Sequence, residues 1–594
     1  MSSPALILLH APSVYDFRKE TILRGPVSDL VPSSSIFEMY PIGFTTLTAH
    51  LEDHGYPVRI VNLAARMLQD PNFDVETFIA DLPEPLAFGI DLHWLPHAHG
   101  SLAVAEIVKR LHPRTPILFG GFSSTYFHRE LLEYPQVDLV MRGDSTEEPV
   151  RMLVEALETG KPLETIPNLS WRDSQGQIHI NEMSYSPPDL GLIKLDYRRI
   201  MISAARDMDL PSYLPFMSWL RYPIMPVLSC RGCIMNCAGC GGSAFAFRHM
   251  HGRSRPAFRS PEQMADDLRQ IASVSNGPIF VLGDIRQAGM EYAQRFLDKV
   301  RGVTEPVIIE LFWPASREFL ALVAESLPNF ALEISIESHD PEVRRAFGKP
   351  YGNEQIEETM RSALDLGAQR LDVFFMVGLP KQTYQSVLDT ADYAQKLLAE
   401  FGTDRRLRPF IGPMAPFVDP GSRAFEQPEA HGYRIFYRTL EEHRRALVEP
   451  SWQFTLNYET DWMSRREIVM ATYDVGMRFN QLKVKYGLVE PSEAERVHQA
   501  LEEGRRLAAE IEQLRARGDL AAIRALRPQI EIINNTRVLE EQSELNLPVG
   551  HPFKVLRLLS LVIEAWVRSL RLRSWQPPKE QTTTAYQASE SAPL

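Results

Sequence analysis

The distribution of cysteine constrains this chain more than any other feature of its sequence. All four cysteines among the 594 residues fall in one stretch, SCRGCIMNCAGCGGS, as Cys230, Cys233, Cys237 and Cys240. Disulfides between thiols so close together would not link distant parts of the chain. Structural zinc sites usually separate two pairs of ligands by a longer loop. The compact C-x2-C-x3-C-x2-C spacing is typical of an iron–sulfur cluster, whose irons a short loop can surround. Structural zinc is the alternative, which metal analysis would decide.

Composition narrows the class of protein. A hydrophobic fraction of 44% is ordinary for a soluble globular protein, and a net charge of −13 argues against a nucleic-acid binder. No run approaches the roughly 18 uncharged apolar residues of a membrane span. The start, MSSPALILLHAPS, has no basic segment or cleavage site, so we expect no signal peptide. With one tight cysteine cluster and no disulfide framework, we expect a cytoplasmic protein.

The last three cysteines carry a resemblance to a known family. The C-x3-C-x2-C spacing of Cys233, Cys237 and Cys240 resembles the radical S-adenosylmethionine (SAM) enzymes. The resemblance implies that these thiolates hold a 4Fe-4S cluster whose open iron binds SAM, and that the reduced cluster cleaves SAM to methionine and a 5′-deoxyadenosyl radical. It also implies an electron donor such as flavodoxin or ferredoxin. Cys230 stands where relatives have a small residue, so we expect a buried neighbour of the cluster, and Gly239 replaces a common aromatic residue.

The chain around the cysteines predicts a matching scaffold. Apolar runs such as PIFVLGD, PVIIELFW and RLDVFFMVGLP alternate with helical patterns over 222–425, and this alternation predicts parallel strands. Six such units fit the partial (β/α)6 TIM-type barrel of radical SAM enzymes. After the cysteines, RSPEQMADDLRQIAS predicts a helix that Ser260 caps, with Gln263 completing a capping box.

Polar residues and glycines at three strand ends are candidate SAM contacts by resemblance. Gly283 and Asp284 resemble the family's Gly-Gly-Glu motif, which holds the SAM amino group. Glu337 and Ser338 resemble the polar pair after the fourth strand, near the SAM ribose and carboxylate. Gly378 resembles the fifth-strand motif beside the adenosyl group. The alternative at each position is a strand-end turn or a satisfied buried polar group.

The first 165 residues form a second α/β pattern. Five apolar runs, from ALILLHAP to VDLVMRGD, are separated by amphipathic helical patterns. Five βα units predict a doubly wound, Rossmann-like sheet whose ligand binds at the carboxyl ends of the strands. The domain resembles the cobalamin-binding domain that precedes many radical SAM barrels. By that resemblance the candidate cobalamin contacts are Asp91, His93, Gly120, Gly121, Ser123, Gly143 and Asp144.

The loop DLHWLPHAHGS holds three histidines, and imidazole is a good transition-metal ligand. His93, His97 and His99 are therefore candidates to coordinate cobalt from below. However, the D-x-H-x-x-G ligand motif of other cobalamin proteins follows the first strand. Here Asp91-x-His93 follows the third strand and Pro96 takes the place of glycine. By resemblance, radical SAM relatives generally leave the lower axial position of cobalt without a protein histidine. Ordinary loop contacts or polar contacts with the corrin edge are the alternative.

The two resemblances together imply a function. Related enzymes that combine cobalamin with a radical SAM site methylate unactivated carbon atoms, which here predicts a C-methyltransferase acting on a small-molecule or lipid substrate. Other relatives use the same parts for cyclisation or rearrangement without net methyl transfer. A third possibility is a cobalamin and iron–sulfur sensor that has lost turnover.

The remaining segments are less informative. We expect a linker over 166–221, a helical C-terminal cap and arm over 426–575, and a disordered tail over 576–594. In the cap, Asn457, Tyr458, Glu459 and Trp462 either touch substrate or pack into the helical core. The stretch 553–573 has a net charge of +4 and a broad apolar face, which fits either a helix on an anionic membrane or a helix docked on protein.

Overall fold

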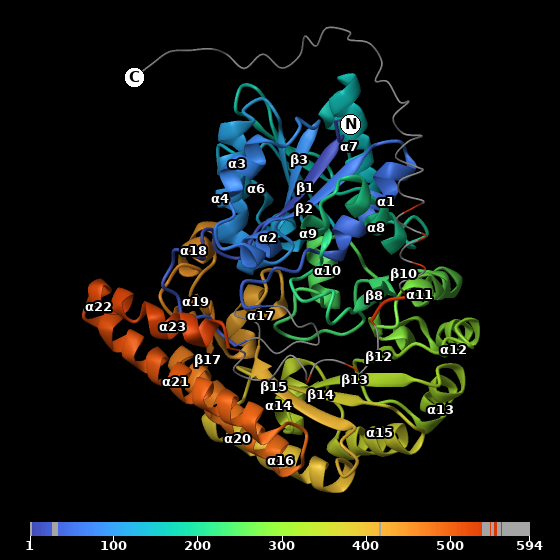
Figure 1. Cartoon of the computed structure of the whole chain (residues 1–594), viewed down its shortest axis with the longest axis vertical. Coiled ribbons are helices and arrows are strands. Elements are labelled where there is room, and N and C mark those ends of the chain that lie inside the picture. The colour runs from blue at the N-terminus through green and yellow to red at the C-terminus, as the bar shows by residue number, and fades with distance from the viewer. Residues whose placement is uncertain are drawn as a thin grey trace.

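The computed structural model of the chain describes residues 3–26, 34–414 and 417–536, together with positions 544, 547, 552–554, 557, 560 and 563. The tail over 576–594 and most of the stretch 553–573 lie outside these residues. Figure 1 shows the N-terminal sheet at one end of the molecule, a second sheet at the other end, and a long helical pair along one side. Within the described ranges, every helix is too short or too polar to cross a bilayer.

The first sheet contains seven strands in the order β2-β1-β3-β4-β5-β6-β7. The first five of these pair in parallel, which confirms the predicted doubly wound sheet, and the last two pair antiparallel at one edge. The strand order reverses between β1 and β3, and this reversal opens the ligand crevice of such sheets. The strands are β1 (Leu6–His10), β2 (Val58–Asn62), β3 (Ala87–Asp91), β4 (Ile117–Gly120), β5 (Leu139–Met141), β6 (Leu169–Arg172) and β7 (Ile178–Ile180).

Helices cover both faces of this sheet, because its central strands are apolar on both sides. The segment 166–221, expected as a linker, supplies β6, β7 and two further helices. The helices are α1 (Ile42–Asp53), α2 (Leu63–Gln69), α3 (Val75–Ala80), α4 (Ala98–Leu111), α5 (Phe122–Tyr126), α6 (His128–Leu131), α7 (Glu147–Thr159), α8 (Tyr197–Arg206) and α9 (Leu210–Tyr213).

The second sheet contains six parallel strands in the order β15-β14-β13-β12-β11-β8. Its first and last strands form the two edges and do not pair with each other, so this sheet is the predicted partial barrel. The strands are β8 (Met225–Leu228), β11 (Ile279–Leu282), β12 (Val307–Leu311), β13 (Phe330–Glu337), β14 (Leu371–Val377) and β15 (Leu407–Pro413). The short pair β9 (Cys230–Arg231) and β10 (Ala257–Phe258) lies just after β8.

The connections of the barrel are helical. Among these helices, α11 begins with the predicted capping box between Ser260 and Gln263. The helices are α10 (Ala244–Met250), α11 (Pro261–Val274), α12 (Met290–Lys299), α13 (Arg317–Ser326), α14 (Pro341–Phe347), α15 (Asn353–Asp365) and α16 (Tyr384–Phe401).

The C-terminal helices cover the β15 edge of the barrel rather than standing free. α20 packs against α16 and β15, and α21 packs on α20 (Figure 1). These helices are α17 (Arg423–Glu426), α18 (Leu440–Ala446), α19 (Trp452–Thr455), α20 (Arg465–Lys485), α21 (Pro491–Ala516), α22 (Leu520–Ala525) and α23 (Arg527–Asn534), and β16 (Tyr433–Ile435) pairs with β17 (Tyr458–Thr460).

An apolar seam joins the two α/β parts. Phe417, Leu440 and Leu447 of the C-terminal half are buried in one cluster with Phe127 and Leu131 of the N-terminal half. α18 lies directly against α4 in this seam. The carboxyl ends of the first sheet are therefore held in place relative to the barrel.

Candidate functional site

The three cysteines of the C-x3-C-x2-C run lie in the loop that follows β9. The amide of Met235 donates to Cys233 Sγ at 3.3 Å, and the amide of Gly242 donates to Cys240 Sγ at 3.2 Å. Such N–H groups stabilise the sulfurs of iron–sulfur clusters. Burial raises the pKa of Cys233 to about 12 and that of Cys240 well above its usual range. Cluster binding would replace the protons of these thiols by iron, and the two N–H donors to the sulfurs fit that role.

The cysteine loop rests on the C-terminal end of α14. The amide of Ala238 donates to the carbonyl oxygen of Phe347 at 2.7 Å. Gly348 has φ of +116°, and a Cβ atom there would lie 2.7 Å from the Asn236 carbonyl oxygen. Only glycine fits this contact, so the end of α14 fixes the loop on both sides of Cys237.

Cys230 uses its thiol in contacts with protein groups. Its Sγ lies 3.6 Å from Ser229 Oγ and 3.6 Å from Gln287 Nε2, and the thiol donates to the Gly232 carbonyl oxygen at 3.5 Å. Burial raises its pKa to about 11. The Cys230 thiol thus has hydrogen-bonding partners of its own within the protein, beside the cysteine loop.

Gly239, which stands where relatives have an aromatic residue, faces two apolar side chains. A Cβ atom at Gly239 would lie 3.1 Å from Met414 Sδ and 3.7 Å from Phe347 Cε2. The space that an aromatic ring at this position would need is thus filled from β15 and α14. The side chains of Met414 and Phe347 supply the apolar surface next to the last cysteine.

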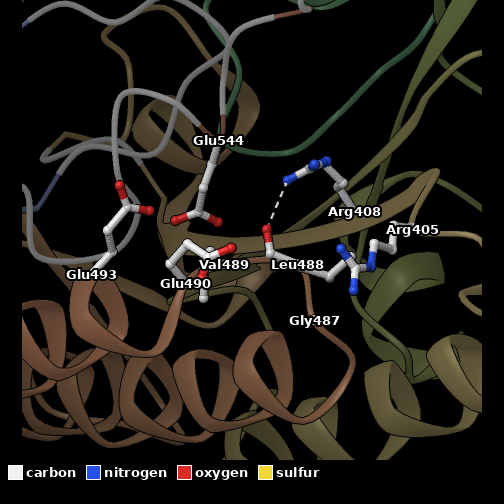
Figure 2. Close-up of a pocket in the computed structure, with 8 residues that line it drawn as sticks. All are labelled: Arg405, Arg408, Gly487, Leu488, Val489, Glu490, Glu493 and Glu544. Carbon is white, nitrogen blue, oxygen red and sulfur yellow. Dashed lines mark hydrogen bonds between the residues drawn. The ribbon is translucent and has the colours of Figure 1, made fainter.

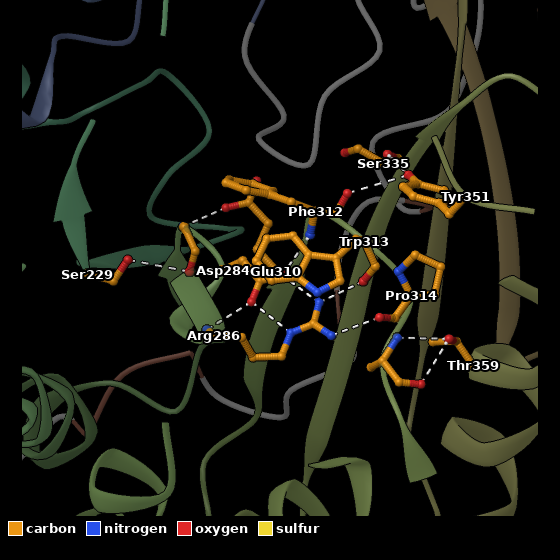
Figure 3. A network of polar contacts seen from close by, with 12 residues as sticks. Ser229, Asp284, Arg286, Glu310, Phe312, Trp313, Pro314, Ser335, Tyr351 and Thr359 are labelled. Carbon is orange, nitrogen blue, oxygen red and sulfur yellow. Dashed lines mark hydrogen bonds and ion pairs between the residues drawn. The ribbon is translucent and has the colours of Figure 1, made fainter. Parts of the chain in front are cut away.

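Gly283 ends β11 with φ of +86°, and a Cβ atom there would lie 2.6 Å from Ser229 Oγ. Its amide donates to Glu310 Oε2 at 2.6 Å. Asp284 is fully buried and accepts from Arg286 Nε at 2.9 Å and from the Phe312 amide at 2.9 Å, as Figure 3 shows.

Arg286 in turn lies over the Trp313 ring, with its guanidinium carbon 4.5 Å from the ring centroid. Both carboxylate oxygens of Asp284 are therefore engaged within the protein. Of the two acids near this turn, Glu310 is the one that touches the Gly283 backbone.

Glu337, at the end of β13, forms a buried ion pair. Lys349 Nζ lies 2.6 Å from Glu337 Oε1, and both side chains are buried. Glu337 Oε2 is buried and has no hydrogen-bond partner among the residues that the structure describes. Burial raises the pKa of Cys237, and the charge of Lys349 opposes that rise, so this pair adjoins the second cysteine. An orphaned carboxylate oxygen beside the cysteine loop fits an acceptor for a cationic ligand group such as the SAM amine.

Ser338 follows directly in the chain and is also buried. Its hydroxyl accepts from the Asp340 amide at 3.1 Å, and its carbonyl oxygen accepts from Arg344 Nη1 at 2.6 Å. These contacts shape the turn into α14.

Gly378 ends β14 with φ of +99°, and a Cβ atom there would lie 2.5 Å from Tyr458 Oη. Its amide donates to Gln382 Oε1 at 2.9 Å. Tyr458 is fully buried, and its hydroxyl finds no hydrogen-bond partner in the described ranges. The neighbouring Asn457 is also buried and bonds both backbone polar groups of Val418. Asn457 and Tyr458 thus belong to the packed core of the cap.

At the carboxyl edge of the first sheet, three ionisable side chains form a chain of hydrogen bonds. His10 Nδ1 lies 2.9 Å from Asp91 Oδ1, and His93 Nδ1 lies 2.6 Å from Asp91 Oδ2. Burial would raise the pKa of Asp91, but the charges and hydrogen bonds of the two histidines hold it well below its usual value. The charged carboxylate stands at the reversal of strand order between β1 and β3.

The glycine pair after β4 lies beside this chain of hydrogen bonds. Gly121 has φ of +116°, and a Cβ atom there would lie 2.3 Å from His93 Cα, so only glycine fits. Within the described part of the chain, a Cβ atom at Gly120 would meet nothing within 4 Å. Ser123 is buried in the first turn of α5. Open space above Gly120 beside a fixed imidazole fits the edge of a large flat ligand.

Gly143 and Asp144 follow β5. The Gly143 amide donates to Thr125 Oγ1 at 3.0 Å. Asp144 is buried and accepts from Arg253 Nη2 at 3.1 Å. Because Arg253 follows α10, Asp144 ties the first sheet to the segment after the cysteine loop.

One carboxylate links the histidine loop directly to the cysteine loop. Trp94 Nε1 donates to Asp419 Oδ1 at 3.2 Å, and the Gly241 amide donates to Asp419 Oδ2 at 2.9 Å. Burial raises the pKa of Asp419. Trp94 adjoins His93 and Gly241 adjoins Cys240, so Asp419 brings the two candidate cofactor sites together.

Sequence reasoning missed four of these side chains. His10 and Asp419 each lie at or after the carboxyl end of a predicted strand, which is a signal that was present in the sequence. Glu310 lies within an apolar strand and Lys349 lies in a turn, and both act through contacts that only the fold creates.

A separate pocket lies at the opposite end of the barrel (Figure 2). Arg408 of this pocket stands near the amino end of β15, whereas Asp419 follows the carboxyl end of that strand. The pocket mixes Arg405 and Arg408 with Glu490, Glu493 and Glu544. It is distinct from the site around the cysteines.

Two family models match the chain. Residues 227–394 match the radical SAM superfamily, and residues 31–152 match the B12 binding domain. The first match contains the cysteine loop. The second contains the histidine loop, the glycine pair Gly120-Gly121 and the Gly143-Asp144 turn.

Three known proteins illustrate the similarity. Cytidylyl-2-hydroxyethylphosphonate methyltransferase from Streptomyces wedmorensis is 22% identical over 71% of this chain and 86% of its own length. The structure of the radical SAM methyltransferase TsrM from Kitasatospora setae, with tryptophan substrate and a SAM analog bound, covers 82% of this chain and 90% of TsrM at 14% identity and a TM-score of 0.54. The structure of the cobalamin-dependent radical enzyme OxsB covers 96% of this chain and 81% of OxsB at 12% identity and a TM-score of 0.53. The two structures share the fold of this chain.

Proposed function

Because this chain is a B12-binding radical SAM superfamily protein, related to cobalamin-dependent radical SAM methyltransferases, we propose that it methylates an unactivated carbon atom. Its cofactors are a 4Fe-4S cluster, SAM and cobalamin. The substrate that we propose is a small molecule or a lipid.

The link through Asp419 is the observation that carries this proposal. It connects the loop of His93 to the loop of Cys240 by two hydrogen bonds, at 3.2 and 2.9 Å. Methyl transfer needs a methyl carrier and a radical source on either side of one substrate carbon, and positioning of reactants supplies much of such catalysis. Two loops held by one carboxylate provide that arrangement.

The residues of the chain have distinct roles in this proposal. When bound, the cofactors supply reductive cleavage of SAM and a methyl group on cobalt. Cys233, Cys237 and Cys240 would hold the cluster. Because Arg286 and the Phe312 amide already engage the Asp284 carboxylate, Glu337 Oε2 rather than Asp284 would accept a hydrogen bond from the SAM amino group. The carboxyl edge of the first sheet around Gly120 carries the corrin. The chemistry consumes electrons, which we propose come from flavodoxin or ferredoxin.

An anaerobic turnover experiment tests the proposal. The protein is reconstituted with iron, sulfide and cobalamin, then given SAM and a low-potential reductant, and products are followed by mass spectrometry. We expect both 5′-deoxyadenosine and S-adenosylhomocysteine. Cys237→Ala should form neither, whereas Cys230→Ala, the matched control, should keep its cluster and both products.

Other outcomes would redirect the assignment. Deoxyadenosine without S-adenosylhomocysteine would contradict methyl transfer and favour a cyclase or rearrangement enzyme. Neither product from a fully loaded protein, with candidate substrates present, would favour the non-catalytic sensor.

A further inference from the structure

We propose that His93 Nε2 is the protein ligand to cobalt on the face of the corrin that is turned toward the first sheet. The inference rests on the cobalamin binding that underlies the proposed function, and it adds a ligand that the family resemblance does not imply. It is argued from the hydrogen bonds, exposure and backbone packing of the residues around His93.

The hydrogen bond to Asp91 prepares His93 for metal binding. Nδ1 of His93 donates to Asp91 Oδ2 at 2.6 Å. With the proton on Nδ1, the lone pair on Nε2 is available. Metal-binding histidines generally donate their second ring nitrogen to a carboxylate in this way, which fixes the tautomer and the ring orientation.

Asp91 is itself held in place by His10. His10 Nδ1 bonds Asp91 Oδ1 at 2.9 Å, and His10 Nε2 donates to the Phe37 carbonyl oxygen at 3.1 Å. The His10 and Asp91 side chains are almost fully buried. The carboxylate therefore cannot swing away from His93 without breaking a buried pair, which is costly.

Exposure separates His93 from the other histidines of its loop. The His93 side chain is 29% exposed, whereas His97 is 1% exposed and donates from Nδ1 to the Ala11 carbonyl oxygen at 3.1 Å. His99 Nδ1 accepts from the Tyr15 amide at 3.3 Å, which uses one lone pair. His99 is also partly exposed, but because its Nδ1 accepts a hydrogen bond, its Nε2 carries the ring proton. Of the three histidines in this loop, His93 alone is both partly exposed and bonded so that its Nε2 has no proton.

The backbone beneath His93 is equally restricted. A Cβ atom at Gly121 would lie 2.3 Å from His93 Cα, so the loop after β4 supports the histidine from one side. The adjacent Gly120 faces open space. The imidazole thus stands at the border of the space that we assign to the corrin.

Electron paramagnetic resonance of cob(II)alamin bound to the full-length protein tests the ligand directly. An axial ¹⁴N ligand splits the cobalt lines into triplets, and ¹⁵N splits them into doublets. The protein is labelled with ¹⁵N-histidine and loaded with unlabelled cobalamin. We expect doublets in the wild type, complete loss of the doublets in His93→Ala, and their retention in the matched control His97→Ala.

Each other result overturns the inference in a recognisable way. Triplets from labelled protein would assign the ligand to the cobalamin's own base, and unsplit lines would assign an oxygen ligand or none. Doublets that vanish in His97→Ala but persist in His93→Ala would assign His97. These results leave methyl transfer standing, because product formation is measured separately, whereas a protein that binds no cobalamin would overturn both proposals.

A second variant tests the role of Asp91 as a positioning residue. Asp91→Asn retains the shape of the side chain but weakens the acceptor for His93. We expect cobalamin still to bind, with the doublets present in a smaller fraction of the cobalt. An unchanged doublet intensity would contradict the positioning role.

Discussion

His443 in α18 occupies the apolar seam between the two halves of the molecule, and both of its ring nitrogens are used. Nδ1 donates to the Thr439 carbonyl oxygen at 2.7 Å, and Nε2 accepts from Asn457 Nδ2 at 3.2 Å. The ring also contacts Phe417, with centroids 5.4 Å apart. Burial lowers the pKa of His443 to about 4. The folded protein therefore holds this ring neutral.

Acidification should weaken the fold through this residue. The unfolded histidine has a pKa near 6.5, so between about pH 6.5 and pH 4 the unfolded state binds a proton that the folded state does not, and stability falls as pH falls. From pH 7.5 to 5.5, His443 should account for about 1 kcal/mol of that loss. Urea unfolding of the wild type and of His443→Gln at pH 7.5 and at pH 5.5 measures this loss. The variant should lose less stability than the wild type between the two pH values. Equal losses would contradict it.

The candidate cluster ligands are residues that the sequence alone predicts. The spacing of Cys233, Cys237 and Cys240 is local, because one short loop must reach several irons. The ion pair of Lys349 with Glu337 is different. The two residues are far enough apart along the chain that their contact depends on how β13 and the turn after α14 pack. No spacing rule predicts that contact.

At the scale of elements, Asp419 acts as a connector between two loops and a strand end. It follows β15 and accepts from Trp94 of the histidine loop and from Gly241 of the cysteine loop. Leaving a buried donor without its acceptor costs about 1–3 kcal/mol. Removal of this carboxylate would leave two such donors at once.

We therefore expect graded effects from two variants of Asp419. Asp419→Ala should lose much of its iron and cobalamin on desalting, because both loops lose the hydrogen bond that links them through this carboxylate. Asp419→Asn retains one acceptor oxygen, so its iron and cobalamin content should lie between that of Asp419→Ala and that of the wild type. Iron, sulfide and cobalamin per chain are measured, with circular dichroism as a check on folding. Wild-type loading of Asp419→Ala would show that the loops hold their positions without this link.

Elements differ in how well sequence predicts them. The capping box of Ser260 and Gln263 follows from residues three apart, and the structure contains it. The parallel strands follow from apolar runs that are buried on both faces. In contrast, β6 and β7 carry polar residues such as Arg172 and His179 and form only by pairing with the edge of β5. Their pattern resembles a linker because their stability comes from the neighbouring strand.

At the scale of the whole molecule, sequence predicts the two α/β parts but not their relative placement. Each part has its own periodic pattern. The surfaces that join them combine single residues from distant segments, such as Asp144 with Arg253 and Tyr126 with Glu426. Because such contacts have no periodicity, the proximity of the histidine loop to the cysteine loop becomes evident only in the folded chain.

A second ion pair across this interface lies close to the cluster loop. Arg231 of β9 donates to Glu147 through Nη1 at 2.8 Å and Nη2 at 2.6 Å, and Thr46 Oγ1 donates to the same carboxylate at 2.6 Å. Burial would raise the pKa of Glu147, but Arg231 holds it below its usual value. Arg231 lies between Cys230 and the cluster ligands, so the pair connects the first turn of α7 to the start of the cysteine loop.

Breaking this pair from either side should destabilise the protein more than removing both partners. Removal of one partner leaves a buried charge uncompensated, which costs about 3–5 kcal/mol, whereas removal of both leaves none. Glu147→Leu and Arg231→Met should each lower the urea midpoint strongly, and the double variant should recover part of the loss. The coupling energy of this cycle measures the interaction. Additive losses of stability would mean that the apolar seam, and not this ion pair, orients the first sheet toward the barrel. The relative position of the two cofactor sites would then depend on Asp419.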